Sequence, residues 1–211
     1  VICHTYSASS CGQPGNAYTF KMKAINSCDS SLASISPIRV YSGPQANFTV
    51  PTVNGCVGSA LTFLNTSILG FNSSCSASTV FTWNFGDGQY QTVTNGGVVT
   101  HTYANPGYYY PTLKVTDASG CTTTSGYAWG AVQVNGPKAA FSASGTNVPL
   151  NTTVDFYNST NTFNSYNTQY SWDFGNGTTS TQYSPSYTFT TAGTYTVKLV
   201  ARDPATGCSS E

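Results

Sequence analysis

The sequence predicts an all-β protein built from β-sandwich domains in tandem, and three observations lead to this prediction. The 211-residue chain contains 20 Gly and 10 Pro, and its apolar residues alternate with polar ones over short runs, which is typical of strands joined by tight turns. Helical periodicity does not extend beyond a single turn. GPQANF at 43–48 returns as GPKAAF at 136–141, so the chain contains an internal repeat.

The repeat extends over most of the chain. Further segments match in the same register: LTFLNTS (61–67) with VDFYNST (154–160), HTYANPGYYYPTLKV (101–115) with YTFTTAGTYTVKLVA (187–201), and YTFKMKAINSC (18–28) with the segment ending at Cys121. This register predicts three units: the C-terminal half of a repeat over 1–42, a complete repeat over 43–135, and a repeat that lacks its last strand over 136–211.

Each unit has the size and strand content of an immunoglobulin-like β-sandwich. Runs such as TVFTWNF (79–85) and YTVKLVA (195–201) alternate apolar with polar residues, which gives a strand one buried and one solvated face. Turn pairs such as Asp87-Gly88 and Asn95-Gly96 separate the runs at hairpin spacing. About seven short strands in about 90 residues is the pattern of this fold.

One octet occurs twice, as TWNFGDGQ at 82–89 and SWDFGNGT at 171–178, and its acid changes position between the copies. A catalytic carboxylate does not tolerate that exchange, whereas Asn and Asp both bond to local backbone groups in turns. We therefore predict a structural motif, with an aromatic pair and a glycine-rich turn in each copy: Trp83, Phe85, Gly86, Asp87 and Gly88, then Trp172, Phe174, Gly175, Asn176 and Gly177.

These motifs resemble the PKD domain family. The octet is followed by H-x-Y or Y-x-F, then by P/A-G-x-Y and a V-x-L-x-V-type strand, in registers that cover nearly the whole chain. The resemblance implies an immunoglobulin-like β-sandwich in each unit. The endings TDASGC and DPATGC, with the opening CVGSALTF, resemble tandem PKD repeats of large cell-surface adhesins of gliding Bacteroidetes. The third unit departs from the second at Pro149, where Cys56 stands, and at Tyr187, where His101 stands.

The composition excludes several classes of protein. Only 7% of the residues are charged and the formal net charge is zero, so no basic surface is available for nucleic acid. No apolar run approaches the ~20 residues that cross a membrane. Seven cysteines without a C-x-x-C pair indicate disulfides in an oxidising compartment, and we expect an extracellular or cell-surface location.

The acids and histidines form no catalytic pattern. Each octet contributes one acid, so the paired carboxylates of a glycosidase are lacking, and His4 and His101 occupy equivalent positions with no nucleophile beside them. Asp87 and Asp173 are the candidates for calcium, which some PKD domains bind, but calcium takes about six to eight oxygen ligands and usually several carboxylates. We predict no enzymatic activity and no cofactor, with calcium as the alternative.

Four aromatic residues are candidates for contact with a partner: Tyr108, Tyr110, Tyr127 and Trp129. Tyr108 and Tyr110 belong to a run of three tyrosines that cannot all face one core. Tyr127 and Trp129 share a parity and could form a flat apolar strip. Such a strip either stacks on sugar rings of a surface polysaccharide or covers a contact between repeats, and we favour the contact because exposed apolar patches mark interaction surfaces.

Two disulfides are predicted from the strand order of a sandwich. The loop between the second and third strands and the last hairpin loop lie at the same end, which predicts a Cys75–Cys121 bridge. Cys56 lies at the opposite end of its domain. In a head-to-tail array that end faces the hairpin of the next unit, so a Cys56–Cys208 bridge between domains is the second prediction.

The two ends of the chain are predicted to depend on other chain material. IRVYSGP at 38–44 matches VQVNGP at 132–137, the last strand of the complete unit, and the third unit has no such segment before Glu211. We expect a window from a longer repeat array, in which other sequence or another molecule covers residues 1–42 and supplies the last strand of the third unit.

These observations favour a non-enzymatic structural segment of a secreted or cell-surface repeat protein, such as an adhesin stalk or an extracellular filament. Its partners would be neighbouring repeats of the same chain or other copies of it. The alternative is a substrate- or carbohydrate-binding PKD module of a secreted hydrolase.

Overall fold

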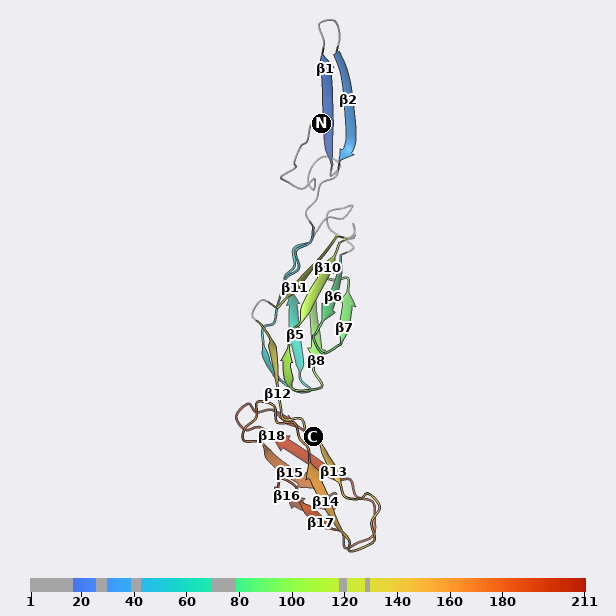
Figure 1. The fold of residues 1–211 in the computed structure, drawn as a ribbon. Helices are drawn as coiled ribbons and strands as arrows, with labels where there is room; N and C mark the ends of the chain where they lie inside the picture. Colours follow the sequence, from blue (N-terminus) through green and yellow to red (C-terminus); the bar gives the residue numbers. More distant parts are fainter. Residues whose placement is uncertain (1–16, 26–29, 39–42, 70–78, 118–120, 128–129) are drawn as a thin grey trace.

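The computed structural model describes residues 17–25, 30–38, 43–69, 79–117, 121–127 and 130–211. Every regular element among them is a β-strand, so the predicted all-β fold is confirmed. Figure 1 shows an N-terminal hairpin followed by two β-sandwiches, which lie end to end along the long axis of the molecule. The described part of the chain contains no helix with the length and apolar character needed to span a membrane.

The hairpin consists of β1 (Tyr18–Ile25) and β2 (Ser30–Ile38). Phe20 pairs with Ile35 and Met22 pairs with Ala33, which places four apolar side chains on one face. These side chains are exposed, Met22 by 51% and Ile35 by 60%. The predicted covering of residues 1–42 by other chain material therefore stays a prediction.

The middle domain is formed by ten of the described strands: β3 (Phe48–Thr49), β4 (Asn54–Cys56), β5 (Ala60–Asn65), β6 (Val80–Asn84), β7 (Tyr90–Val93), β8 (Val98–Thr102), β9 (Gly107–Tyr109), β10 (Thr112–Thr116), β11 (Thr122–Gly126) and β12 (Val132–Asn135). They pair in the orders β3-β5-β8, β11-β10-β6-β7 and β4-β12-β9. The first two sheets are the faces of the sandwich. The third lies at the end that leads into the next domain (Figure 1).

Strand alternation produces the core of the middle domain. Trp83 on β6 pairs with Leu113 on β10, and Phe81 pairs with Val115; all four side chains are almost fully buried. Phe63 on the opposite sheet packs edge-on against Trp83, with ring centroids 5.9 Å apart. Large aromatic rings thus fill the space between the two sheets.

The third domain repeats this arrangement with β13 (Phe141–Ala143), β14 (Thr153–Asn158), β15 (Gln169–Asp173), β16 (Thr179–Ser180), β17 (Ser186–Thr188), β18 (Lys198–Arg202) and β19 (Ser209–Ser210). The orders β13-β14-β17 and β16-β15-β18-β19 correspond to the two faces of the middle domain. Trp172 and Phe174 are buried in its core, as Trp83 and Phe85 are buried in the core of the middle domain.

The domains differ in their third sheet. In the middle domain β12 lies between β4, to which it is parallel, and β9, to which it is antiparallel. Its side chains Val132 and Val134 are buried. The register of the repeat places the counterpart of β12 beyond Glu211, so residues 130–211 hold no equivalent of it. The segments equivalent to β4 and β9, 147–149 and 193–195, are not paired as strands.

Candidate functional site: the disulfide-linked junction between two domains

The two octets form the same turn. In each copy, side-chain oxygens accept hydrogen bonds from the backbone N–H groups two residues later: Asn84 from Gly86 at 2.9 Å and Asp87 from Gln89 at 3.0 Å, then Asp173 from Gly175 at 2.8 Å and Asn176 from Thr178 at 3.1 Å. Each bond uses Oδ1, an atom that Asn and Asp share. The acid can therefore change position without a change of the turn.

The acid and the amide differ in a second contact. Asp87 Oδ2 lies 2.7 Å from His101 Nε2, whereas Asn176 Nδ2 donates to the Tyr187 hydroxyl at 2.8 Å. Both rings stack on the phenylalanine of their octet: His101 on Phe85, with centroids 3.9 Å apart, and Tyr187 on Phe174, with centroids 4.3 Å apart. The acid of the first copy is therefore paired with a histidine and the amide of the second with a tyrosine. In both copies the paired ring stacks on the phenylalanine of the octet.

Backbone conformation and close packing both require glycine at the first glycine position of each turn. Gly86 and Gly175 have φ values of 83° and 79°, a region in which other residues are strained. A Cβ at Gly86 would lie 2.9 Å from the backbone N of Tyr110, and one at Gly175 would lie 2.6 Å from the backbone O of Thr196. Each turn therefore packs closely against the backbone of a neighbouring segment, at Tyr110 in the middle domain and at Thr196 in the third.

These contacts describe a structural turn. The calcium candidates Asp87 and Asp173 cap backbone groups, and the second oxygen of Asp87 is held by His101. In the described ranges no three His, Cys, Asp or Glu residues lie close enough to hold a metal ion. The second candidate site is the contact between the two sandwiches.

The linker between the domains is hydrogen-bonded to both of them. The Asn135 carbonyl accepts a hydrogen bond from the Val57 N–H at 3.0 Å, and the Gly136 N–H donates to the Phe163 carbonyl at 3.1 Å. Residues 135–137 are buried. A Cβ at Gly136 would approach the Asn161 carbonyl oxygen to 3.0 Å, so glycine permits this close contact.

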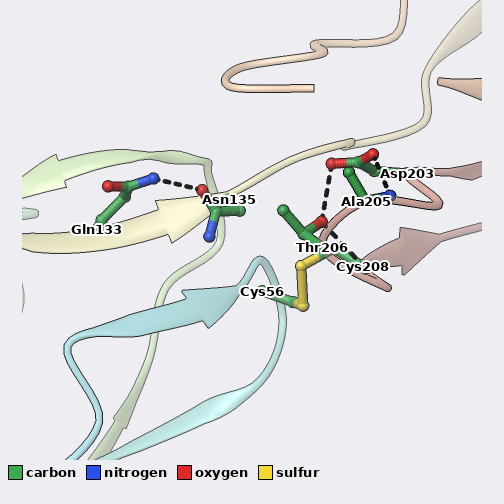
Figure 2. Close-up of a disulfide and its surroundings, with 7 residues drawn as sticks. All are labelled: Cys56, Gln133, Asn135, Asp203, Ala205, Thr206 and Cys208. Carbon is green, nitrogen blue, oxygen red and sulfur yellow. Dashed lines mark hydrogen bonds between the residues drawn. A yellow bond between two sulfur atoms is a disulfide. The ribbon is translucent and has the colours of Figure 1, made fainter. Parts of the chain in front are cut away.

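A disulfide provides the second covalent connection. Cys56 at the end of β4 bonds to Cys208 just before β19, with the two Cα atoms 5.4 Å apart, a separation that is usual for a disulfide. Figure 2 shows the bridge between the Gln133–Asn135 pair of the middle domain and the loop of the third domain that contains Asp203. The predicted bridge between domains is thus present.

The loop that holds Cys208 is built on Asp203. Its carboxylate accepts hydrogen bonds from the Ala205 N–H at 3.0 Å and from the Thr206 hydroxyl at 2.8 Å (Figure 2). The Asp203 N–H donates to the Cys208 carbonyl at 2.8 Å, which closes the hairpin. These donors, the Ala205 N–H foremost, lower the pKa of the Asp203 carboxyl because they stabilise its charged form.

Side chains add a further set of contacts across the junction. The ring of Tyr108 packs edge-on against Phe163, with centroids 5.3 Å apart, and its hydroxyl accepts a hydrogen bond from Asn164 at 3.2 Å. Lys138 Nζ donates to Asn105 Oδ1 at 2.7 Å. Of these junction residues, only Tyr108 was predicted from the sequence as a contact residue.

Models of protein families match both sandwiches. One model, described as PKD domain, matches residues 138–210, and a second model of the same description matches residues 42–128. The chain belongs to the PKD domain family. Its two described sandwiches are PKD domains in tandem, and the junction is a contact between consecutive PKD domains.

Solved structures include other PKD domains. The PKD1 domain of Vibrio anguillarum Epp is 26% identical, with a TM-score of 0.34 over 44% of this chain and 94% of that one. The PKD domain of the human receptor SorCS2 is 17% identical, with a TM-score of 0.37 over 56% of this chain and 92% of that one. A comparison with curated proteins finds no match.

Of the other predicted contact aromatics, the structure describes Tyr110 and Tyr127. Tyr127 is half-buried and packs on Phe48 of the core, with ring centroids 5.9 Å apart. Tyr110 is 66% exposed. Trp129 lies outside the described residues. The ring of Tyr127 faces the core, so Tyr127 does not contribute to the flat exposed strip that was predicted for it and Trp129.

Cys121 of the middle PKD domain corrects one prediction. Cys121 has a free thiol, so the predicted Cys75–Cys121 bridge is not formed in this structure; Cys75 itself lies outside the described residues. The repeat explains the difference. Cys121 is equivalent to Cys208, which bonds to the preceding domain and not within its own, so this position of the hairpin is directed toward the preceding repeat.

Proposed function

We propose that this chain is a tension-bearing segment of a secreted or cell-surface repeat protein, such as an adhesin stalk or an extracellular filament. The observation that carries the proposal is the Cys56–Cys208 disulfide, which joins two consecutive PKD domains at points 152 residues apart in the sequence.

The position of the bridge determines how a pull on the chain is transmitted. Cys56 lies near the start of the middle domain and Cys208 near the end of the third. Tension applied from the two sides passes through the bridge, so the residues between the two cysteines are bypassed. At about 3.5 Å per extended residue, this loop holds roughly 50 nm of chain that cannot be released while the bridge is intact.

The remaining junction contacts resist bending. The linker is paired with both domains through Asn135 and Gly136, and the Tyr108–Phe163 and Lys138–Asn105 contacts add to it. Two covalent connections and these contacts restrict the rotation of one domain against the other. A chain of such units keeps its direction over several repeats, as a stalk or filament requires.

The same features favour an oxidising location and a role without catalysis. A disulfide between domains persists outside the cytosol, which supports an extracellular or cell-surface site. The octets, the strongest sequence motif of the chain, are used in turns. We therefore propose a non-enzymatic function.

Single-molecule force spectroscopy tests the proposal. The 211-residue chain is held by its two ends and stretched with and without a reducing agent. Under oxidising conditions, extension should stop short by roughly 50 nm relative to the reduced chain, because the loop from Cys56 to Cys208 stays closed. Equal extension under both conditions would contradict the proposal.

A pair of serine variants controls for other thiols. Cys208→Ser opens the bridge and should extend under oxidising conditions as the reduced chain does. Cys121→Ser changes the equivalent cysteine of the other domain, which is free, and should behave as the wild type. If both variants extend alike, the tension does not pass through the Cys56–Cys208 bridge.

A substrate- or carbohydrate-binding module of a secreted hydrolase is the second candidate, and the exposed ring of Tyr110 favours it. Pull-down on chitin, cellulose or collagen distinguishes the two. Retention of the chain that is lost in Tyr110→Ala would support the module. Absence of retention on these polymers leaves the tension-bearing segment as the function that the structure favours.

A further inference from the structure

A groove of about 510 Å³ lies on the outer face of the sheet β16-β15-β18-β19 in the third PKD domain. Side chains from three neighbouring segments of this sheet line it, among them Gln169, Ser171, Thr181, Val200 and Arg202. All five are exposed, whereas their chain neighbours Trp172, Leu199 and Ala201 are buried. Alternation along the strands therefore directs the groove side chains away from the core.

The sheet register brings the polar side chains of the groove together. Gln169 on β15 lies opposite Arg202 on β18, and Ser171 lies opposite Val200. The Cβ atoms of such opposite pairs are about 5 Å apart. Thr181 directly follows β16, whose Ser180 pairs with Trp172 on β15, and the same register places Thr181 beside Ser171. A guanidinium, a carboxamide and two hydroxyls therefore surround the side chain of Val200.

The cation of the groove is available to a ligand. Within the described part of the chain, the Arg202 guanidinium makes no ion pair and no hydrogen bond. Lys198, on the same strand and the same face, differs because its Nζ lies 2.6 Å from Glu211 Oε1. A guanidinium has five N–H donors in a fixed planar arrangement, and all of those of Arg202 can bond to a bound molecule.

The groove does not depend on the last strand of the repeat. In the middle domain that strand is β12, which pairs with β4 and β9 and not with the sheet β11-β10-β6-β7. The outer face of that sheet stays exposed at Lys114, the equivalent of Val200. Thr116 occupies the position of Arg202 there, so the free guanidinium belongs to the third domain.

We propose that this groove binds an acidic polysaccharide, with Arg202 holding the carboxylate of a uronate sugar. The planar guanidinium matches the two oxygens of a carboxylate. The Gln169 carboxamide and the two hydroxyls both donate and accept hydrogen bonds, as sugar hydroxyls do, and Val200 offers an apolar contact to the C–H groups of the ring. This inference goes beyond the tension-bearing role and does not depend on it.

The groove suits a sugar chain better than an acidic peptide. An extended peptide binds to a sheet mainly through main-chain hydrogen bonds at an exposed edge. Beneath the groove, β15 is paired with β16 on one side and with β18 on the other, and β18 is paired with β19 at Ala201 and Arg202. The main chain is thus already bonded, and side chains supply the free donors and acceptors.

Isothermal titration calorimetry of the 211-residue chain tests the proposal. The probes are oligosaccharides of polygalacturonate, alginate and hyaluronate, and each has its own methyl ester as the uncharged control. At neutral pH and low salt, where charges are screened least, at least one acidic probe should bind. Its methyl ester should bind at least about ten-fold more weakly, because the charge-assisted hydrogen bonds to Arg202 are lost. Binding of none of the three, or equal binding of an ester, would overturn the proposal.

NMR spectroscopy locates the bound probe. The Nε–H signal of Arg202 is assigned from its loss in Arg202→Lys, and this signal and the side-chain amide signals of Gln169 should shift when the probe is added. Shifts confined to the middle domain would overturn the proposal.

Two further ligands distinguish the chemistry of the anion. Dextran sulfate that binds at Arg202 more tightly than every uronate probe would overturn the choice of a carboxylate. A polyglutamate peptide that binds there as tightly as the best uronate probe would overturn the choice of a sugar chain.

A matched pair of variants tests the groove from the protein side. Arg202→Gln removes the positive charge from the groove, and Lys114→Gln removes one positive charge from the equivalent face of the middle domain, where Lys114 is exposed. Arg202→Gln should weaken the best probe at least about ten-fold, and Lys114→Gln should not. Arg202→Lys keeps the charge without the planar fork and should bind with intermediate affinity. Circular dichroism checks that the variants fold, and a folded Arg202→Gln variant that binds normally would contradict the proposal.

Discussion

At the scale of single residues, two octet positions accept either Asn or Asp because both side chains present the same oxygen to the same backbone N–H. Asn84 and Asp173 occupy one of these positions and accept hydrogen bonds of nearly equal length. The charge is not used by the turn. This is the physical reason why the acid can appear at a different place in each repeat.

A pair of substitutions at Asp173 tests this account of the turn. Asp173→Asn keeps the oxygen that caps the Gly175 N–H and should lower the free energy of unfolding by less than about 0.5 kcal/mol. Asp173→Ala removes the cap and should cost about 1 kcal/mol. Urea denaturation measures both values. An Asn variant that is as destabilised as the Ala variant would show that the charge matters.

Asp203 differs from the octet acids because its carboxylate accepts several hydrogen bonds in the loop that carries Cys208. Its folded pKa lies below the usual value of 3.8, through the Ala205 N–H and then the Thr206 hydroxyl. The unfolded chain thus binds the proton more readily than the folded one. The contribution of Asp203 to stability is therefore present above about pH 4 and is lost as the pH falls through the folded pKa.

The pH dependence gives the corresponding measurement. Urea denaturation of the wild type from about pH 6 to about pH 2 should show a stability that falls below about pH 4. Asp203→Asn should be less stable at neutral pH and should show a smaller fall. An unchanged fall in this variant would assign the acid sensitivity to other carboxyls.

At the scale of elements, alternation and the repeat predict most of the strands. Phe81, Trp83, Leu113 and Val115 all follow the period of two and are all buried. The repeat register also predicts a third unit over 136–211 without its last strand, and this division of the chain stays a prediction. What alternation could not predict is the small sheet of β4, β12 and β9, because its strands are three or four residues long and are defined by their neighbours.

The turn glycines give a prediction at this scale. Gly175 and Gly177 have similar φ values, 79° and 84°, but a Cβ would clash with Thr196 at the first and meet nothing within 4 Å at the second. Gly177→Ala should cost about 1–2 kcal/mol for the left-handed backbone. Gly175→Ala should cost about 1–3 kcal/mol more, for overpacking against the Thr196 backbone. Thermal or urea unfolding compares them, and equal losses would contradict the close packing of the turn.

At the scale of the whole molecule, the sequence predicted the tandem arrangement but only part of the junction. The Cys56–Cys208 bridge follows from the position of each cysteine at the facing ends of two domains. The partner assigned to Cys121 was wrong because that assignment assumed a bridge within one domain. Phe163 and Asn164 were missed because only the fold brings them to Tyr108.

Peptide mapping of the unreduced chain by mass spectrometry tests the central claim most directly, that two PKD domains are joined by a disulfide across their junction. The chain is blocked with an alkylating agent, digested and analysed before and after reduction. The account predicts one linked pair of peptides that contains Cys56 and Cys208, and an alkylated Cys121. A Cys56 that is alkylated, or that is linked to any cysteine other than Cys208, would contradict it.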